Sequence, residues 1–80
     1  MDRQVATEKT LAVFREVFDE ISGLTEQTSA DDIDKWDSLN HVILIRELEK
    51  AFGITFDLFE IIEIRDVSGL IDYICEKNNA

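Results

Sequence analysis

Apolar residues recur at helical spacing in three stretches of this chain, and almost none of it alternates in the manner of a β-strand. The stripe of the first stretch consists of Leu11, Phe14, Phe18 and Ile21, with Val17 beside them. Charged side chains fill most positions around it. The pattern predicts an amphipathic helix that stops near Gly23, because glycine adopts the left-handed conformation at which many helices end.

The second stretch predicts a helix from Ser38 to Phe52, with Asp37 as its N-cap and Gly53 as its stop. A turn of 100° per residue gives it two faces. The face expected to meet the core holds Leu44, Ile45, Leu48, Ala51 and Phe52, with His41 on the same arc. The opposite face holds Leu39, Ile43, Arg46 and Lys50, with Val42 on one flank. Leu39 and Ile43 are therefore expected to be exposed beside Ser38.

The remaining segments complete an all-α pattern. Residues 24–37 are rich in Thr, Ser and Asp and predict a long loop. Residues 57–64 are short and apolar and predict a third helix of one to two turns. In the last stretch Asp66 can cap a helix whose stripe is Val67, Leu70, Ile71 and Ile74. We predict a small four-helix bundle, three longer helices and a short third one, forming a single domain over residues 1–80.

Composition narrows the class of protein. With 80 residues, 45% of them hydrophobic, the chain can build one modest core. A single cysteine, Cys75, excludes an internal disulfide or a multi-cysteine metal site and fits a reducing compartment. Neither an export signal nor a membrane-spanning run is evident. These features predict a cytoplasmic monomer.

The charge of the chain is strongly negative and unevenly spread. The net charge of −10 divides into −6 for residues 1–37, 0 for residues 38–52 and −4 for residues 53–80. Such a protein repels nucleic acid and anionic lipid and favours partners with basic surfaces. The predicted second helix, however, is neutral, so a partner that binds there is expected to recognise shape and apolar contact, with Asp31, Asp32, Asp34 and Asp37 providing electrostatic steering.

The acidic loop does not predict a metal site. Asp32 and Asp34 match the first two ligand positions of an EF-hand calcium loop, but Trp36 stands at the third and no glycine follows where the loop requires one. A solvated acidic loop is the better interpretation.

The sequence Trp36-Asp37-Ser38-Leu39 places a lone hydroxyl at the start of the second helix. If Asp37 caps the helix, Ser38 is its first residue and points outward. A phosphate ester on Ser38 would lie beside free amides and the positive end of the helix dipole. Trp36 is expected to pack at the helix entrance as a staple-like residue. The stretch therefore predicts an attachment point.

Asp37-Ser38-Leu39, the apolar helix behind it, the acidic 80-residue chain and the ending Asp66-Val67-Ser68-Gly69-Leu70-Ile71-Asp72-Tyr73-Ile74 together resemble an acyl carrier protein. The resemblance implies that Ser38 carries 4′-phosphopantetheine, whose thiol holds acyl groups as thioesters, and that Asp37 places the serine. It implies partner contacts through the exposed face of the second helix, for which we select Leu39, Val42, Ile43 and Arg46. It also implies an acyl pocket beneath the arm, for which we select His41, Leu44 and Leu48.

The implied partners are a phosphopantetheinyl transferase, which takes the arm from coenzyme A, and enzymes that load, transfer or condense acyl groups. Catalysis by the chain itself is not expected: His41 follows Ser38 by three residues, but no orienting group or oxyanion hole accompanies them. The neutral second helix favours a specialised lipid, polyketide or related pathway over a general fatty-acid carrier. An aminoacyl or peptidyl carrier, and a helical adaptor that only uses the Leu39 and Ile43 patch, stay open as alternatives.

Overall fold

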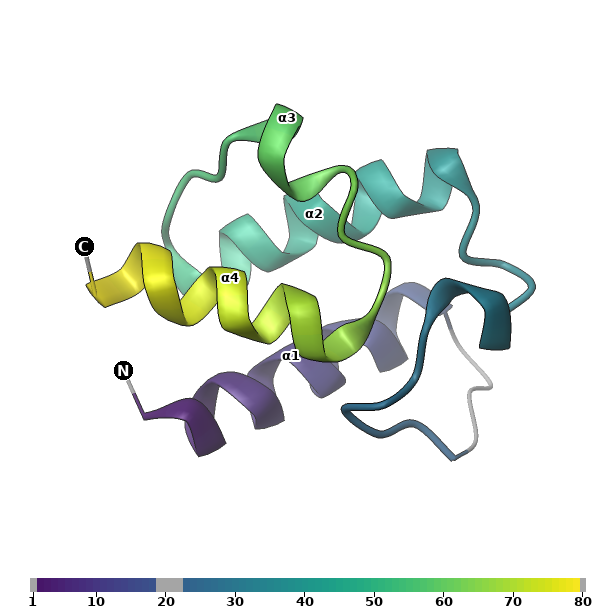
Figure 1. Ribbon diagram of the computed structural model, residues 1–80, viewed down its shortest axis with the longest axis horizontal. Coiled ribbons are helices and arrows are strands. Elements are labelled where there is room, and N and C mark those ends of the chain that lie inside the picture. Colours follow the sequence, from purple (N-terminus) through teal and green to yellow (C-terminus); the bar gives the residue numbers. More distant parts are fainter. Residues whose placement is uncertain (1, 19–22, 80) are drawn as a thin grey trace.

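The computed structural model describes residues 2–18 and 23–79, and in this part of the chain the predicted all-α architecture is confirmed (Figure 1). The elements are α1 Arg3–Phe18, the 3₁₀-helix η1 Ala30–Asp32, α2 Ser38–Phe52, α3 Leu58–Ile61 and α4 Val67–Asn79. α1 packs against both α2 and α4. The short α3 lies apart from α1, on the far side of the bundle in Figure 1.

The bounds of α2 are those that the sequence predicted. Asp37 is its N-cap, and the Asp37 carboxylate accepts a hydrogen bond from the Asn40 amide at 2.8 Å. Gly53 ends the helix with a φ of +66°, and its amide donates to the Glu49 carbonyl at 2.8 Å. A side chain at position 53 would be strained at this φ, which explains why the helix stops at a glycine.

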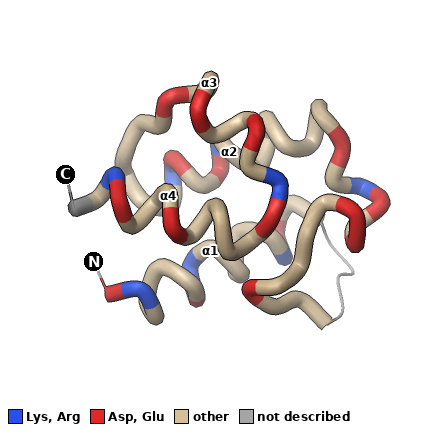
Figure 2. The backbone as a smooth tube through the Cα atoms, in the orientation of Figure 1, with Lys and Arg blue, Asp and Glu red and all other residues tan. Residues whose placement is uncertain are grey.

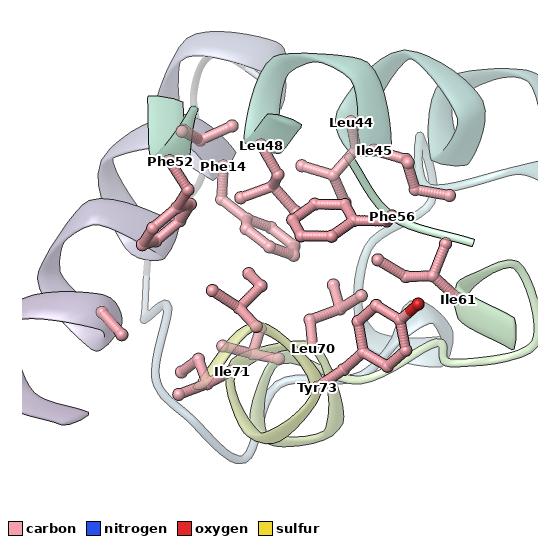
Figure 3. Packing of buried hydrophobic residues seen from close by; sticks show 14 of the residues in the cluster. Phe14, Leu44, Ile45, Leu48, Phe52, Phe56, Ile61, Leu70, Ile71 and Tyr73 are labelled. Carbon is pink, nitrogen blue, oxygen red and sulfur yellow. The ribbon is translucent and has the colours of Figure 1, made fainter. Parts of the chain in front are cut away.

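Apolar side chains from all four helices meet in one core. In Figure 3, Leu44 and Leu48 point from α2 toward Leu70 and Ile71 of α4. The predicted α4 stripe of Val67, Leu70, Ile71 and Ile74 is fully buried, as expected.

Two details of the predicted core were wrong. On α1 the buried residues are Ala6, Thr10, Val13, Phe14 and Phe18. Leu11 and Val17 are only half-buried, because the small residues Ala6 and Thr10 set the face that approaches the neighbouring helices. Ala51 is exposed, since it lies at the edge of the α2 arc in the last turn. Ile21 lies outside the described residues, as do the other residues between Phe18 and Gly23. Gly23 itself has a φ of +69°.

The N-termini of the last two helices, α3 and α4, are capped differently. Asp57 caps α3, its carboxylate accepting from the Phe59 amide at 3.0 Å, and α3 is a single turn. Asp66 precedes α4, and its carbonyl accepts from the Leu70 amide at 3.2 Å. The Asp66 carboxylate makes no cap hydrogen bond within the described ranges, but it lies over the first turn, where a Cβ on Gly69 would come within 2.5 Å of it.

The loop before α2 is tied to the loop between α3 and α4. The Ala30 amide donates to the Arg65 carbonyl at 2.8 Å, and the Val67 amide donates to the Thr28 carbonyl at 2.9 Å. Ser29 and Asp66 form an isolated antiparallel bridge. The loop also contains η1, which the sequence analysis did not predict, although Ser29 and Asp32 form a capping box there. These bonds fix the position of Arg65 relative to the start of α2.

Candidate functional site

Ser38 is the first residue of α2, and its side chain is exposed. Its position follows from the cap: Asp37 adopts an extended conformation with φ −99°, and the chain becomes helical at the next residue. The turn before the helix is held by a second hydrogen bond, from Asn40 Nδ2 to the Lys35 carbonyl at 2.7 Å. The Ser38 hydroxyl is thus accessible on a rigidly placed backbone.

The surroundings of Ser38 favour an anion. The Asn40 amide donates to the Asp37 carboxylate, but the amides of Ser38 and Leu39 donate to no partner among the described residues. Unpaired first-turn amides carry the positive end of the helix dipole. A phosphodiester on Ser38 Oγ would lie at this end of α2.

Arg65 also lies at the start of α2. Its Nη2 atom is 3.5 Å from Ser38 Oγ, and the hydrogen bond from Ala30 to its carbonyl holds this part of the chain in place. The sequence did not predict Arg65 as a residue of the site. Ser38 begins α2, whereas Arg65 lies 27 positions further along the chain, in the loop before α4, so no local sequence pattern connects the two residues.

His41 is fully buried below this surface. Its Nδ1 accepts a hydrogen bond from Trp36 Nε1 at 2.8 Å, which places the proton of the neutral ring on Nε2, 3.4 Å from the Ile61 carbonyl oxygen. Burial lowers the pKa of His41, and the nearby positive charge of Arg65 adds to this effect, against the hydrogen bond to Ile61. Both ring nitrogens face these two partners, so neither is directed at the Ser38 hydroxyl.

Trp36 has the staple-like position that the sequence predicted. It is buried at the entrance of α2, where its ring forms a T-shaped pair with Phe14 at a centroid distance of 5.0 Å and a tilted pair with Phe18 at 6.1 Å. Trp36 precedes the N-cap and His41 is the fourth helical residue, which are the two positions that a hydrophobic staple joins. The direction in which the chain enters α2 is therefore fixed by core packing.

The expected exposure of Leu39 and Ile43 is confirmed, at 71% and 42%. Val42 and Arg46 line a pocket of about 140 Å³ between α2 and α3, together with Ile45, Glu49, Phe56 and Leu58. The structure adds Leu58 and Phe59 of α3 to the exposed apolar side chains, with Phe59 at 89%. From the sequence, both were predicted only as part of a short apolar helix.

The carboxylates of α2 are occupied within the protein. Glu49 Oε2 accepts from the Phe56 amide at 2.9 Å, and Glu47 pairs with Lys50 at 3.4 Å. Figure 2 shows both signs of charge on α1 and α2, whereas acidic positions predominate in the rest of the described chain. α2 therefore has no net charge, and its exposed face contains Leu39 and Ile43.

The predicted acyl-pocket residues His41, Leu44 and Leu48 are all fully buried in the packed core. The pocket between α2 and α3 is lined by other residues of α2. A chain that reached Leu44 or Leu48 in this conformation would have to displace core side chains, so their role as a lining stays a prediction.

Neither a metal site nor a membrane span is found in the part of the chain that the structure describes. No three or more His, Cys, Asp or Glu side chains there are grouped so that they could hold a metal ion. No helix there is both long and apolar enough to cross a bilayer.

Comparison with known families identifies a match. The family described as the phosphopantetheine attachment site matches residues 8–74, which include the whole of α2 and both loops around Ser38. A search of curated proteins found no match. The residues at the start of α2 fit the group: an exposed hydroxyl can form the ester, and free amides and a guanidinium lie beside it. The chain is thus a member of the phosphopantetheine attachment-site family, a small helical carrier protein whose prosthetic group is 4′-phosphopantetheine.

Proposed function

We propose that Ser38 bears the 4′-phosphopantetheine arm and that the protein carries acyl groups on it between biosynthetic enzymes. The observation that carries this proposal is the exposed Ser38 hydroxyl at the first position of a capped helix, inside the matched residues. When bound, the group supplies a thiol that holds acyl groups as thioesters. The chain contributes the attachment atom, the orientation of the arm and the surface that partners recognise.

Other serines of the described residues fit less well. Ser29 lies in the capping box of η1, where its hydroxyl is 3.4 Å from the Asp32 carboxylate. Ser68 lies in the first turn of α4 and is half-buried. Ser38 alone among these combines exposure with the Asp-Ser-Leu context.

Attachment requires a separate transferase. Ser38 Oγ forms a bond to the phosphorus next to the pantetheine unit of coenzyme A, and the pyrophosphate bond to the adenosine bisphosphate portion breaks. The hydroxyl proton passes to a base of the transferase. His41 does not accept it, because its ring is held by Trp36 and turned away from Ser38. Asp37 keeps Ser38 at the helix start, and the free amides beside it favour the new negative charge.

We infer an acyl cargo in a specialised lipid, polyketide or related pathway. The pocket between α2 and α3 supports an aliphatic chain, since four of its six lining residues, Val42, Ile45, Phe56 and Leu58, are apolar. The neutral face of α2 supports partners that differ from those of carriers with acidic docking helices. An aminoacyl or peptidyl carrier shares the same serine, so the cargo needs its own test.

The attachment site is tested by intact mass after incubation with coenzyme A and a broad-specificity phosphopantetheinyl transferase. Wild type is expected to gain one phosphopantetheinyl unit and Ser38→Ala none. Ser68→Ala is the matched control, a serine in the first turn of another helix, and is expected to be modified like wild type. A modified Ser38→Ala variant, or wild type that stays unmodified, refutes the assignment and leaves an adaptor as the better interpretation.

The cargo is tested by loading Ser38 with acyl-pantetheine arms of increasing chain length and with an aminoacyl arm. If the pocket shelters an aliphatic chain, the midpoint of thermal unfolding rises with chain length, because burial of each methylene is favourable. An aminoacyl arm that stabilises the protein more than every fatty acyl arm would favour the aminoacyl carrier.

A further inference from the structure

The guanidinium of Arg65 stands beside the attachment atom without belonging to the helix that carries it. Arg65 Nη2 lies 3.5 Å from Ser38 Oγ. Its side chain is exposed, and no carboxylate within residues 2–18 and 23–79 forms an ion pair with it. In a chain of net charge −10, this leaves a cation next to the hydroxyl that becomes the ester.

The position of Arg65 is set by tertiary structure. Its carbonyl accepts from the Ala30 amide at 2.8 Å, and the adjacent Asp66 is bridged to Ser29. The Asp66 carboxylate is turned toward Gly69 and the first turn of α4. The loop is thereby fixed on both sides of Arg65, and the carboxylate of the neighbouring Asp66 lies against the first turn of α4 and forms no ion pair with Arg65 among the described residues.

We propose that Arg65 is the counter-ion of the phosphodiester that joins 4′-phosphopantetheine to Ser38 and that it restrains the base of the arm. This inference rests on the proposed attachment at Ser38. In the phosphodiester, the charged oxygens would be bonded to the phosphorus attached to Ser38 Oγ, the atom that Arg65 Nη2 already approaches. A guanidinium suits them because its parallel N–H donors match the oxygens of a phosphate. The positive charge of Arg65 also acts on His41, where it adds to burial in lowering the pKa of the imidazole.

The pairing predicts that attachment of the arm stabilises the protein more when Arg65 is present than when it is replaced. Apo and holo forms of wild type, Arg65→Gln and Lys50→Gln are prepared, and the midpoint of thermal unfolding is measured for each. Lys50 is the matched control: it is an exposed cation on α2, twelve residues from Ser38 and therefore roughly 18 Å along the helix. Its pair with Glu47 is lost equally from both forms.

We expect the apo-to-holo shift of the midpoint to be more positive in wild type than in Arg65→Gln by roughly 2 to 5 °C at low salt. The difference is expected to shrink at high salt. Lys50→Gln is expected to show the wild-type shift, and Arg65→Lys part of it, because lysine keeps the charge but not the paired donors. Equal shifts in wild type and Arg65→Gln overturn the inference.

A spectroscopic readout checks the same contact without reference to stability. The phosphorus chemical shift of the holo protein is expected to change in Arg65→Gln and to stay unchanged in Lys50→Gln. Intact mass of each sample separates the two proposals. If wild type lacks the arm or Ser38→Ala gains it, the attachment proposal fails; if all holo samples form but neither the midpoint nor the phosphorus signal depends on Arg65, only the counter-ion inference fails.

Discussion

Trp36 donates its indole N–H to Nδ1 of His41 at 2.8 Å, across the N-cap of α2. The two rings are tilted, with centroids 5.8 Å apart, and both are buried. One contact therefore does two things: it closes the staple at the helix entrance and it selects the tautomer of the only histidine in the chain. Ser38 lies on the outer surface of this same turn.

The first prediction concerns pH. Because burial lowers the pKa of His41 in the folded state, the unfolded chain binds a proton more readily than the folded one as the pH falls below about 6.5. The free energy of unfolding should then decrease by at most about 1.4 kcal/mol per pH unit, down to the lowered pKa. Urea unfolding between pH 7.5 and 5.5 measures this loss.

The control for the pH prediction is His41→Asn, which keeps an acceptor for Trp36 but cannot titrate. This variant is expected to be less stable at neutral pH and to lose less free energy on acidification over the same range. A wild-type protein whose stability is flat from pH 7.5 to 5.5 would show that His41 is not held neutral.

The second prediction tests the hydrogen bond itself. Trp36→Phe keeps an aromatic ring against Phe14 but leaves His41 Nδ1 buried without a donor. An unsatisfied buried acceptor costs about 1–3 kcal/mol, and the smaller ring adds a cavity. Chemical denaturation gives the total loss, and nitrogen NMR of the single imidazole shows whether its tautomer is still fixed. A variant that keeps both the wild-type stability and the wild-type tautomer would contradict this role.

The third prediction separates the role of Asp37 as a cap from that of Ser38 as the proposed attachment residue. Asp37→Ala removes the bond to the Asn40 amide and is expected to cost about 1 kcal/mol, the usual loss for an N-cap side chain. Ser38→Ala removes an exposed hydroxyl and is expected to change stability by less than about 0.5 kcal/mol. Thermal unfolding of the two variants at one pH makes the comparison. Asp37→Ala should also slow modification, whereas equal stabilities would mean that the Asp37 carboxylate contributes little as a cap.

The fourth prediction concerns docking to α2. Ile43 is 42% exposed beside Leu39, while Glu47 and Glu49 are engaged within the protein. Burying an isoleucine is worth roughly 1.5 to 3 kcal/mol, more than the 0 to 1 kcal/mol typical of an exposed ion pair. Ile43→Glu should therefore weaken binding to the cognate partner more than Glu47→Gln, which removes one carboxylate from the same helix.

Binding titrations at low and high salt check the docking prediction, and they distinguish apolar from electrostatic recognition. The wild-type interaction is expected to be only weakly sensitive to salt. Binding that collapses at high salt, with Ile43→Glu as tight as wild type, would indicate docking through carboxylates instead.

Local signals explain what the sequence predicted well. The bounds of α2 follow from Asp37 and Gly53, whose chemistry acts within one turn, and the stripe of α4 follows from a periodicity that tertiary contacts preserved. The α1 stripe was less accurate, because Ala6 and Thr10 are not conspicuous in a hydrophobic pattern but are small enough to bring helices together. η1 has a local signal in Ser29 and Asp32, but both residues are also typical of loops, so the sequence predicted only a loop there.

The relationships around the candidate site needed the structure. Trp36 and His41 were each placed at the core or its edge, but the hydrogen bond between them depends on how their rings pack against Phe14 and Phe18. Arg65 had no signal at all, since its approach to Ser38 depends on the bonds between the loops at Ala30 and Asp66. Local caps and stripes predicted the helix that carries Ser38, whereas its neighbours come from segments that meet only in the folded chain.

The bonds between residues 28–30 and 65–67 have a consequence for when modification can occur. The start of α2, the loop before it and the loop before α4 are separated by up to 39 positions, counted from Thr28 to Val67. A nascent chain in which α2 has left the ribosome but residue 65 has not can expose Ser38, but it lacks Arg65 and the bonds between the two loops. A transferase that reads these surroundings acts on completed, folded chains, so attachment of the arm would serve as a record of successful folding.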